Sequence, residues 1–138
     1  MSDPLSAALH ISSSGLRAQS ERLRVVSENL ANARSTGKTA GSDPYSRKTI
    51  TFESEFDRAR QAELVKIKNI GKDKSPFTVE YEPGHPAADE TGYVKMPNVN
   101  VLLELADMRE TNRSYEANLK VMTQAREMVM RDIALLRD

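Results

Sequence analysis

The sequence predicts a mainly α-helical protein with a long helix at each end and a short antiparallel β region between them. Three observations carry this prediction: apolar residues at heptad spacing near the N-terminus, the same spacing near the C-terminus, and alternating apolar and polar residues in the middle. We expect an N-terminal core helix in residues 1–36, an irregular linker plus a small β region in 37–100, and a C-terminal core helix in 101–138.

The N-terminal helix is predicted from steps of alternately four and three residues that begin at Leu5. Asp3 suits the N-cap and Pro4 the first helical position, while Gly37 among Ser and Thr residues predicts the end of the helix. Most positions reached are large aliphatic residues at the 3.5-residue period of a coiled-coil seam. The positions are Leu5, Leu9, Ser12, Leu16, Gln19, Leu23, Val26, Leu30 and Ala33.

The C-terminal helix follows the same pattern over a stretch that is free of Gly and Pro. Pro97 provides the entry to this helix, and Asn98 or Asn100 provides the N-cap. Almost every position of its stripe is apolar or aromatic, so the signal is stronger than in the first helix. The positions are Val101, Leu105, Met108, Asn112, Tyr115, Leu119, Met122, Arg126, Val129, Ile133 and Leu136.

A narrow apolar stripe must lie on a partner, so we expect the two helices to pair in a coiled-coil-like manner. Polar residues interrupt both stripes and are expected to fix the register (Ser12, Gln19, Asn112 and Arg126). Further apolar residues lie off the stripes: Ile11, Val25, Leu102, Leu103, Met128, Met130 and Leu135. One pair of helices cannot cover all of these, so further partners are expected. An ordinary helical core with irregular edges is the alternative interpretation.

The middle of the chain predicts three or four short strands that follow a turn-rich linker in residues 34–46. Apolar and polar residues alternate in 48–53 and again in 77–81, and residues 64–70 are compatible with a strand. A break at residues 83–86 and a polar turn precede a last short strand at Tyr93-Val94. So few inward side chains make a weak independent core.

Composition excludes several classes of function. Twenty Lys and Arg residues balance twenty Asp and Glu residues, which argues against a nucleic-acid binder and against a polybasic membrane-surface protein. The chain has no Cys, so disulfides and zinc–thiolate sites are excluded. The longest aliphatic run, residues 133–136, is too short to span a membrane, so no direct membrane insertion is expected. The N-terminus has no pattern of an ordinary secretory signal.

No group of residues predicts catalysis or metal binding. His10 and His85 each lack a second His at ligand spacing, and the run of Ser residues before Gly15 is not the Gly-flanked Ser of a nucleophile elbow. Carboxylates such as Glu104 and Glu110 lie among basic residues, which is typical of a solvated helix face. We therefore expect no catalytic residue, no cofactor, no metal and no enzymatic activity.

Three segments resemble a known family. The stretch 14–19, followed by Arg22-Leu23 and 27–33, resembles the N-terminal signature of bacterial flagellar axial proteins, the rod, hook and hook-associated subunits. Residues 113–118, continuing to Val121-Met122, resemble the C-terminal signature of the same family. The joint at 83–100 is similar to that of proximal rod subunits in particular.

The resemblance implies a structural subunit of the proximal rod, the drive shaft of the flagellum, which assembles by packing of its terminal helices and transmits torque. It implies a location in the basal-body rod within the periplasmic space, reached through the flagellar type III export apparatus without a cleaved signal. The implied partners are other rod subunits, copies of the same chain, and the rod-to-ring junction and distal rod proteins. The absence of Cys is compatible with export of an unfolded chain.

Two sets of residues are expected to serve assembly. The packing stripe comprises Leu16, Leu23, Val26, Leu30, Tyr115, Leu119 and Met122. The polar residues of the family motifs are Asn29, Asn32, Asn98, Asn100, Asn112 and Asn118, of which Asn29, Asn32, Asn112 and Asn118 are expected to be buried or half-buried and to fix register. Plain surface exposure is the alternative for these four.

Two other functions remain open at this point. A cytoplasmic coiled-coil adaptor accounts for the heptads, although it accounts for neither the paired terminal signatures nor the joint before the second helix. Another flagellar axial or rod-junction subunit is the second alternative.

Overall fold

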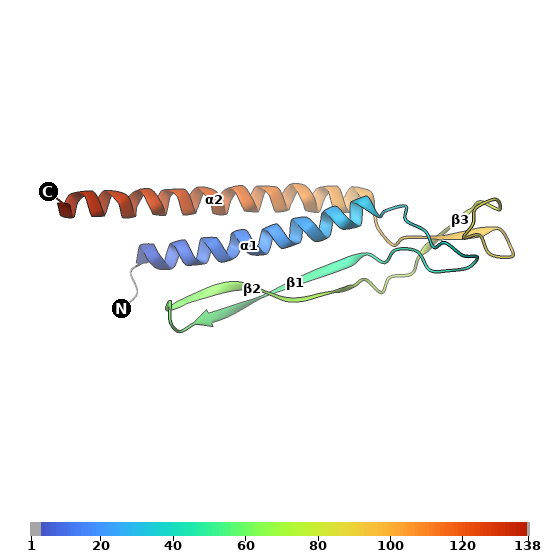
Figure 1. The fold of residues 1–138 in the computed structure, drawn as a ribbon, viewed down its shortest axis with the longest axis horizontal. Coiled ribbons are helices and arrows are strands. Elements are labelled where there is room, and N and C mark those ends of the chain that lie inside the picture. The colour runs from blue at the N-terminus through green and yellow to red at the C-terminus, as the bar shows by residue number, and fades with distance from the viewer. Residues whose placement is uncertain (1–3, 138) are drawn as a thin grey trace. The chain divides into compact units, whose positions relative to one another are not determined.

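The computed structural model describes residues 4–137, which form two long helices and four strands. In chain order these are α1 (Pro4–Ala31), β1 (Lys48–Asp57), β2 (Ala62–Lys72), β3 (Thr78–Tyr81), β4 (Tyr93–Met96) and α2 (Val101–Arg137). Figure 1 shows the two long helices, which come from the two ends of the chain (blue and orange to red). The strands come between the helices in the sequence. The predicted fold class is confirmed.

The chain divides into two compact units. The first contains the described residues as far as Leu23, residues 51–69, and the described residues from Arg109 onward. The second contains residues 24–50 and 70–108. Each long helix contributes a segment to each unit, and within a unit the segments of α1 and α2 run in opposite directions (Figure 1). The predicted division of the chain into domains at residues 1–36, 37–100 and 101–138 stays a prediction.

The helix ends show how the local sequence satisfies the backbone. Helix α1 ends at Ala31, before the end predicted at Gly37. Asn32 closes the last turn, because its Nδ2 donates a hydrogen bond to the carbonyl of Glu28 at 2.8 Å. Helix α2 begins at Val101, where Asn100 is the N-cap. Asn100 Oδ1 accepts hydrogen bonds from the backbone N–H groups of Leu102 and Leu103 at 3.1 and 3.3 Å. The predicted N-cap Asp3 lies outside the described residues.

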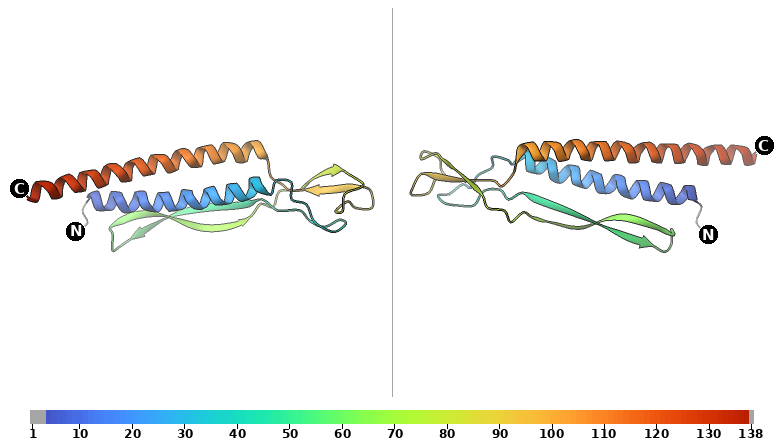
Figure 2. Two further views of the ribbon diagram at one scale, coloured as in Figure 1. Left: turned by 45° about the horizontal axis from the view of Figure 1, so that its top comes forward. Right: turned by 180° about the vertical axis from the view of Figure 1, so that it is seen from behind.

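The strands form two separate two-stranded sheets rather than one region, β1 with β2 and β3 with β4. All four predicted strands are present, and β1 and β2 extend beyond their predicted ends. In the first unit the β1–β2 hairpin runs along α1, as both views of Figure 2 show. The backbone N–H of Val65 donates to Ser14 Oγ at 3.1 Å, so the hairpin is tied to the helix.

The second hairpin has its own small core and depends on Gly92. β3 and β4 pair antiparallel, with Tyr81 opposite Tyr93, and Val94 and Met96 are buried against Ala87. Gly92 precedes β4 with a φ of +86°, a conformation that L side chains rarely adopt. A Cβ on Gly92 would lie 2.9 Å from Cε2 of the Tyr81 ring.

We expect Gly92→Ala to loosen the β3–β4 hairpin, because the new methyl group meets both a positive φ and the ring of Tyr81. Amide hydrogen exchange at Tyr93 and Val94 should accelerate, and the free energy of unfolding should fall by about 1–2 kcal/mol. Gly84→Ala is the matched control, since a Cβ there meets no atom within 4 Å. Equal exchange rates in the two variants would contradict this assignment.

Candidate assembly interface

Helix α2 faces the rest of the chain with small and polar side chains. Its buried residues are Glu104, Thr111 and Ala125, and Asn118 on the same line is half-buried. The spacing of seven residues agrees with a coiled-coil-like contact. Each of these residues lies one position before a residue of the predicted stripe, whereas the predicted positions Met108, Met122 and Val129 are half-buried beside them. The contact face is therefore rotated from the predicted one by less than the roughly 100° between neighbouring residues.

The rotation leaves large apolar side chains of the predicted stripe on the surface. Leu119 is 41% exposed and Ile133 is 49% exposed, although both were predicted to lie in the seam between the helices. The exposed large apolar residues of α2 are Val101, Leu102, Leu103, Leu105, Tyr115, Leu119, Val121, Met128, Met130, Ile133, Leu135 and Leu136. Such a density of exposed apolar residues on one helix is typical of a surface that binds other proteins.

Close approach explains why small residues occupy the contact within the chain. In the first unit Gly15 of α1 packs on the side chain of Asn118, and a Cβ on Gly15 would lie 3.0 Å from Asn118 Nδ2. Ser12 and Ala18, each three residues from Gly15, are also buried. A large aliphatic residue at either of these two positions would hold the backbones apart, so Gly15 and Asn118 fit this close contact.

The seven residues of the predicted packing stripe therefore do not share one environment. Val26 is fully buried within the chain. Leu16, Leu23, Leu30 and Met122 are half-buried. Tyr115 and Leu119 are exposed. The role of these seven residues in packing between subunits stays a prediction.

Asn29 is the centre of a buried hydrogen-bond network in the second unit. Its side chain is 1% exposed. Asn29 Nδ2 donates to the carbonyl of Lys48 at 2.9 Å, and the N–H of Lys48 donates to Asn29 Oδ1 at 2.8 Å. The Tyr45 hydroxyl donates to the same oxygen at 2.7 Å. The amide thus pairs with the start of β1 as another strand would. Asn29 is buried as expected, and its role in fixing register stays a prediction.

Asn98 joins two segments that are distant in sequence. Its Oδ1 accepts the N–H of Arg47 at 2.7 Å, and its Nδ2 donates to the carbonyls of Asp73 and Ser75 at 3.1 and 3.0 Å. Since Asn100 caps α2, the two alternatives for the cap are resolved and Asn98 has a different role. It holds the start of β1 beside the segment that follows β2.

An ion-pair cluster lies beside Asn98. Arg47 Nε donates to Glu104 Oε1, and Arg47 Nη1 lies 3.3 Å from Asp73 Oδ2. Burial of the guanidinium lowers the pKa of Arg47, but the hydrogen bonds and charges of Glu104 and then of Asp73 raise it by more, so the pKa of Arg47 lies above its ordinary value. The hydrogen bonds from Ser75, together with Arg47, lower the pKa of Asp73. The sequence placed Glu104 on a solvated face, which is wrong: this carboxylate is 1% exposed.

The remaining motif residues play smaller parts within the chain. Asn32 is half-buried and closes α1, and its Oδ1 accepts the Ser35 hydroxyl at 2.9 Å. Asn112 is exposed, so it does not fix register within the chain and the alternative of surface exposure applies. Asn118 is half-buried against Gly15, as expected.

No group of three His, Asp or Glu residues in 4–137 could hold a metal ion, and no described helix is long and apolar enough to cross a membrane. His85 is used in its own turn, where Nδ1 accepts the N–H of Ala87 at 3.0 Å. His10 is half-buried in α1.

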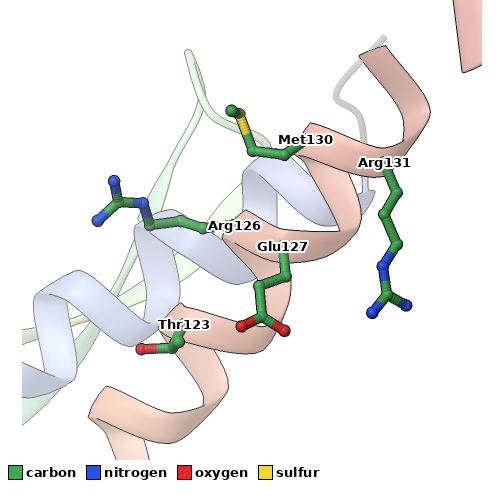
Figure 3. A pocket seen from close by; sticks show the side chains of 5 residues that line it. All are labelled: Thr123, Arg126, Glu127, Met130 and Arg131. Atoms are coloured by element: carbon green, nitrogen blue, oxygen red, sulfur yellow. The ribbon is translucent and has the colours of Figure 1, made fainter. Parts of the chain in front are cut away.

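A hollow of about 360 Å³ lies along α2. Figure 3 shows that its described lining comes from this helix alone, with Thr123, Arg126, Glu127, Met130 and Arg131 around it. The two guanidinium groups point in different directions, so they do not converge on a common ligand (Figure 3). This hollow is a feature of an open helix surface rather than an enclosed binding site.

A long helix that exposes many large apolar side chains is typical of the class of proteins that bind other proteins through a helix face. Comparison with known proteins gives the particular family. The family described as flagellar basal body rod FlgEFG protein C-terminal matches residues 90–135. Over 135 residues the chain is 62% identical to the flagellar basal-body rod protein FlgC of Agrobacterium fabrum, which covers 98% of this chain and 97% of that protein.

More distant relatives are also flagellar basal-body rod proteins named FlgC. The chain is 38% identical to FlgC of Salmonella typhimurium over 125 residues, covering 91% of this chain and 92% of that protein. It is 35% identical to FlgC of Bacillus subtilis over 143 residues, covering 93% and 95%. The chain belongs to the FlgC family of flagellar basal-body rod proteins.

Family membership establishes the general function. The chain is a structural subunit of the flagellar basal-body rod, it is located in that rod, and it assembles with other flagellar components. The interpretation as a cytoplasmic coiled-coil adaptor is therefore set aside.

We expect Asn29→Ala to lower the free energy of unfolding by about 2–3 kcal/mol, because it leaves the buried backbone groups of Lys48 without partners. Urea denaturation followed by circular dichroism measures this change. The control is Asn112→Ala, an exposed amide on α2, for which we expect a change below about 0.5 kcal/mol. Similar losses in both variants would show that Asn29 has no special role.

We expect Arg47→Met to cost on the order of 2–3 kcal/mol of folding free energy, because it leaves the Glu104 carboxylate buried without its cation. The double variant Arg47→Met/Glu104→Leu should recover to within about 1 kcal/mol of the original chain. Arg34→Met, which breaks the exposed pair with Glu80, serves as control and should change stability by less than about 0.5 kcal/mol. A double variant as unstable as the single one would refute this account.

Proposed function

We propose that the chain is a subunit of the proximal rod, that the exposed apolar side chains of α2 bind neighbouring subunits, and that torque passes through this packing. One observation carries the proposal: the contact within the chain uses small and polar residues of α2, whereas large apolar residues such as Leu119 and Ile133 stay exposed. On this proposal the protein works by assembly and catalyses no reaction.

The energetics favour assembly over isolation. Fully burying a large aliphatic side chain contributes about 1.5–3 kcal/mol, and many such residues on α2 are about half exposed. Small and polar residues within the chain contribute much less. Docking against neighbours therefore adds apolar burial that the separate chain lacks, and it orders long helices that are marginal alone.

The length of the middle segment supports a proximal position. The strands between the helices form only two short hairpins, and longer rod and hook subunits are expected to carry larger inserted domains there. The proposed neighbours are copies of this chain and other rod subunits, together with the rod-to-ring junction and distal rod proteins. The flagellar export apparatus is the proposed route to the rod.

A shaft of laterally packed helices resists twisting because its contacts are distributed along each helix. Interiors packed at native density deform little and transmit strain. No single bond has to bear the load, so torque is carried by many apolar contacts of the kind that α2 exposes.

We expect Leu119→Asp to abolish incorporation into the rod and motility, because a carboxylate would be buried in the interface between subunits. Basal bodies purified from cells that carry the variant should lack this chain. Since Leu119 is exposed in the separate chain, the helical circular dichroism of the purified variant should be unchanged.

The matched control is Gln124→Asp, which introduces the same charge at an exposed position on another side of α2. This variant should enter basal bodies and support motility. Normal motility of the Leu119→Asp strain, or equal loss in both strains, would overturn the assignment of Leu119 to the interface.

A further inference from the structure

His85 links two segments of the second unit that are far apart in the sequence. It lies in the turn between β3 and β4 and is half-buried. Its Nδ1 accepts the backbone N–H of Ala87 at 3.0 Å, and its Nε2 lies 3.3 Å from the Thr36 hydroxyl oxygen, in the linker after α1. The N–H of Gly41, also in the linker, donates to the carbonyl of Ala87 at 3.2 Å. We call these three hydrogen bonds the linker–turn contact.

The linker–turn contact requires a neutral imidazole with its proton on Nε2. A backbone N–H can only donate, so Nδ1 must offer its lone pair to Ala87 and cannot carry a proton. The one proton of the neutral ring is then on Nε2, which donates to the Thr36 oxygen. A second proton would go to Nδ1 and would place two donors face to face. The contact is therefore specific for the uncharged form of His85.

The N–H group that His85 accepts is poorly placed to find another partner. Ala87 is 2% exposed and belongs to the small core of the second hairpin, with Val94 and Met96. A buried N–H that loses its acceptor costs free energy unless the segment opens to water. Because the ring is rigid, a rotation that moves Nδ1 away from Ala87 also moves Nε2 away from Thr36. Protonation of His85 therefore favours opening of the whole linker–turn contact.

No fixed charge around the ring offsets a positive charge on it. No ion pair among the described residues includes His85. The hydrogen bond from the Thr91 hydroxyl, followed by that from the N–H of Tyr93, lowers the pKa of Asp89, so this carboxylate of the same turn stays ionised at mildly acidic pH. The charged residues of the linker and of 78–96 are all exposed: Arg34, Lys38, Asp43, Glu80, Glu82, Asp89, Glu90 and Lys95. The tyrosines of the same segments, Tyr45, Tyr81 and Tyr93, are neutral at this pH.

We propose that His85 makes the linker–turn contact sensitive to pH. Histidine is the side chain whose ordinary charge change falls between about pH 5 and 8. Above that range the neutral ring holds Ala87 and Thr36 together, and the contact is closed. As the pH falls, the protonated ring no longer accepts the N–H of Ala87, so the contribution of this contact to stability is lost and the turn opens locally. The proposal is independent of the proposed packing of α2, since it uses other residues.

The test is amide hydrogen exchange of the purified full-length chain, measured by NMR at about pH 7.5 and about pH 5.5. Protection factors are compared, because they remove the pH dependence of the intrinsic exchange rate. Selective ¹⁵N labelling of His reports the tautomer of His85 in the same samples. We expect the Nε2–H tautomer and protected amides of Ala87 and Gly41 at the higher pH. Protection of both amides should fall about fivefold or more at the lower pH.

Three variants separate this mechanism from general acid unfolding. His85→Asn does not titrate and keeps an acceptor, because an Asn side-chain oxygen binds the N–H two residues further on. Protection at Ala87 in this variant should differ by less than about twofold between the two pH values. His85→Ala has no acceptor, so protection at Ala87 should be low at both. His10→Asn, in the first unit, is the matched control and should keep the full pH response.

Several results would overturn the proposal. These are an Nδ1–H tautomer at the higher pH, an Ala87 amide that is unprotected there, protection that does not change with pH, or a pH response that persists in His85→Asn. Loss of the response in His10→Asn would also refute it. Equal loss of protection in both units at the lower pH would show global unfolding instead of local opening.

Discussion

Close contact between small and polar side chains of the two long helices is the constraint on which the rest of the structure depends. Gly15 packs directly on Asn118, and Thr111 and Ala125 follow the same line of α2. Because this line is buried, the aliphatic residues one position further along the helix turn outward. The rotation of α2 therefore decides both which of its residues are buried and which of its large apolar residues are exposed.

Polar groups, rather than a large apolar core, organise the second unit. Asn29 binds the backbone of β1, Asn98 joins that strand to the segment after β2, and Arg47 pairs with the buried Glu104. Directional bonds of this kind specify one arrangement where few apolar side chains are available. The hydrogen bonds and ion pairs of this unit therefore do the ordering that a large apolar core would otherwise do.

The sequence predicted much of this protein, for identifiable reasons. Helix α2 begins at the predicted Val101, since Pro and Asn before it are strong local signals, and Asn29 is buried as expected. The resemblance to flagellar axial proteins agrees with the family to which the chain belongs. Glu104 was missed because an acidic residue among basic ones on a helix is usually solvated, and its partner Arg47 is far away in sequence.

By itself the sequence determined the two helices, the strand positions and the family, because capping residues, heptad spacing and alternation act over short distances. Only the tertiary structure decided which side of each helix is inside. Heptad spacing marks an apolar stripe but does not state whether the partner of that stripe lies in the same chain or in another one. Here Gly15 permits a close polar contact with Asn118, and Leu119 and Ile133 are left exposed.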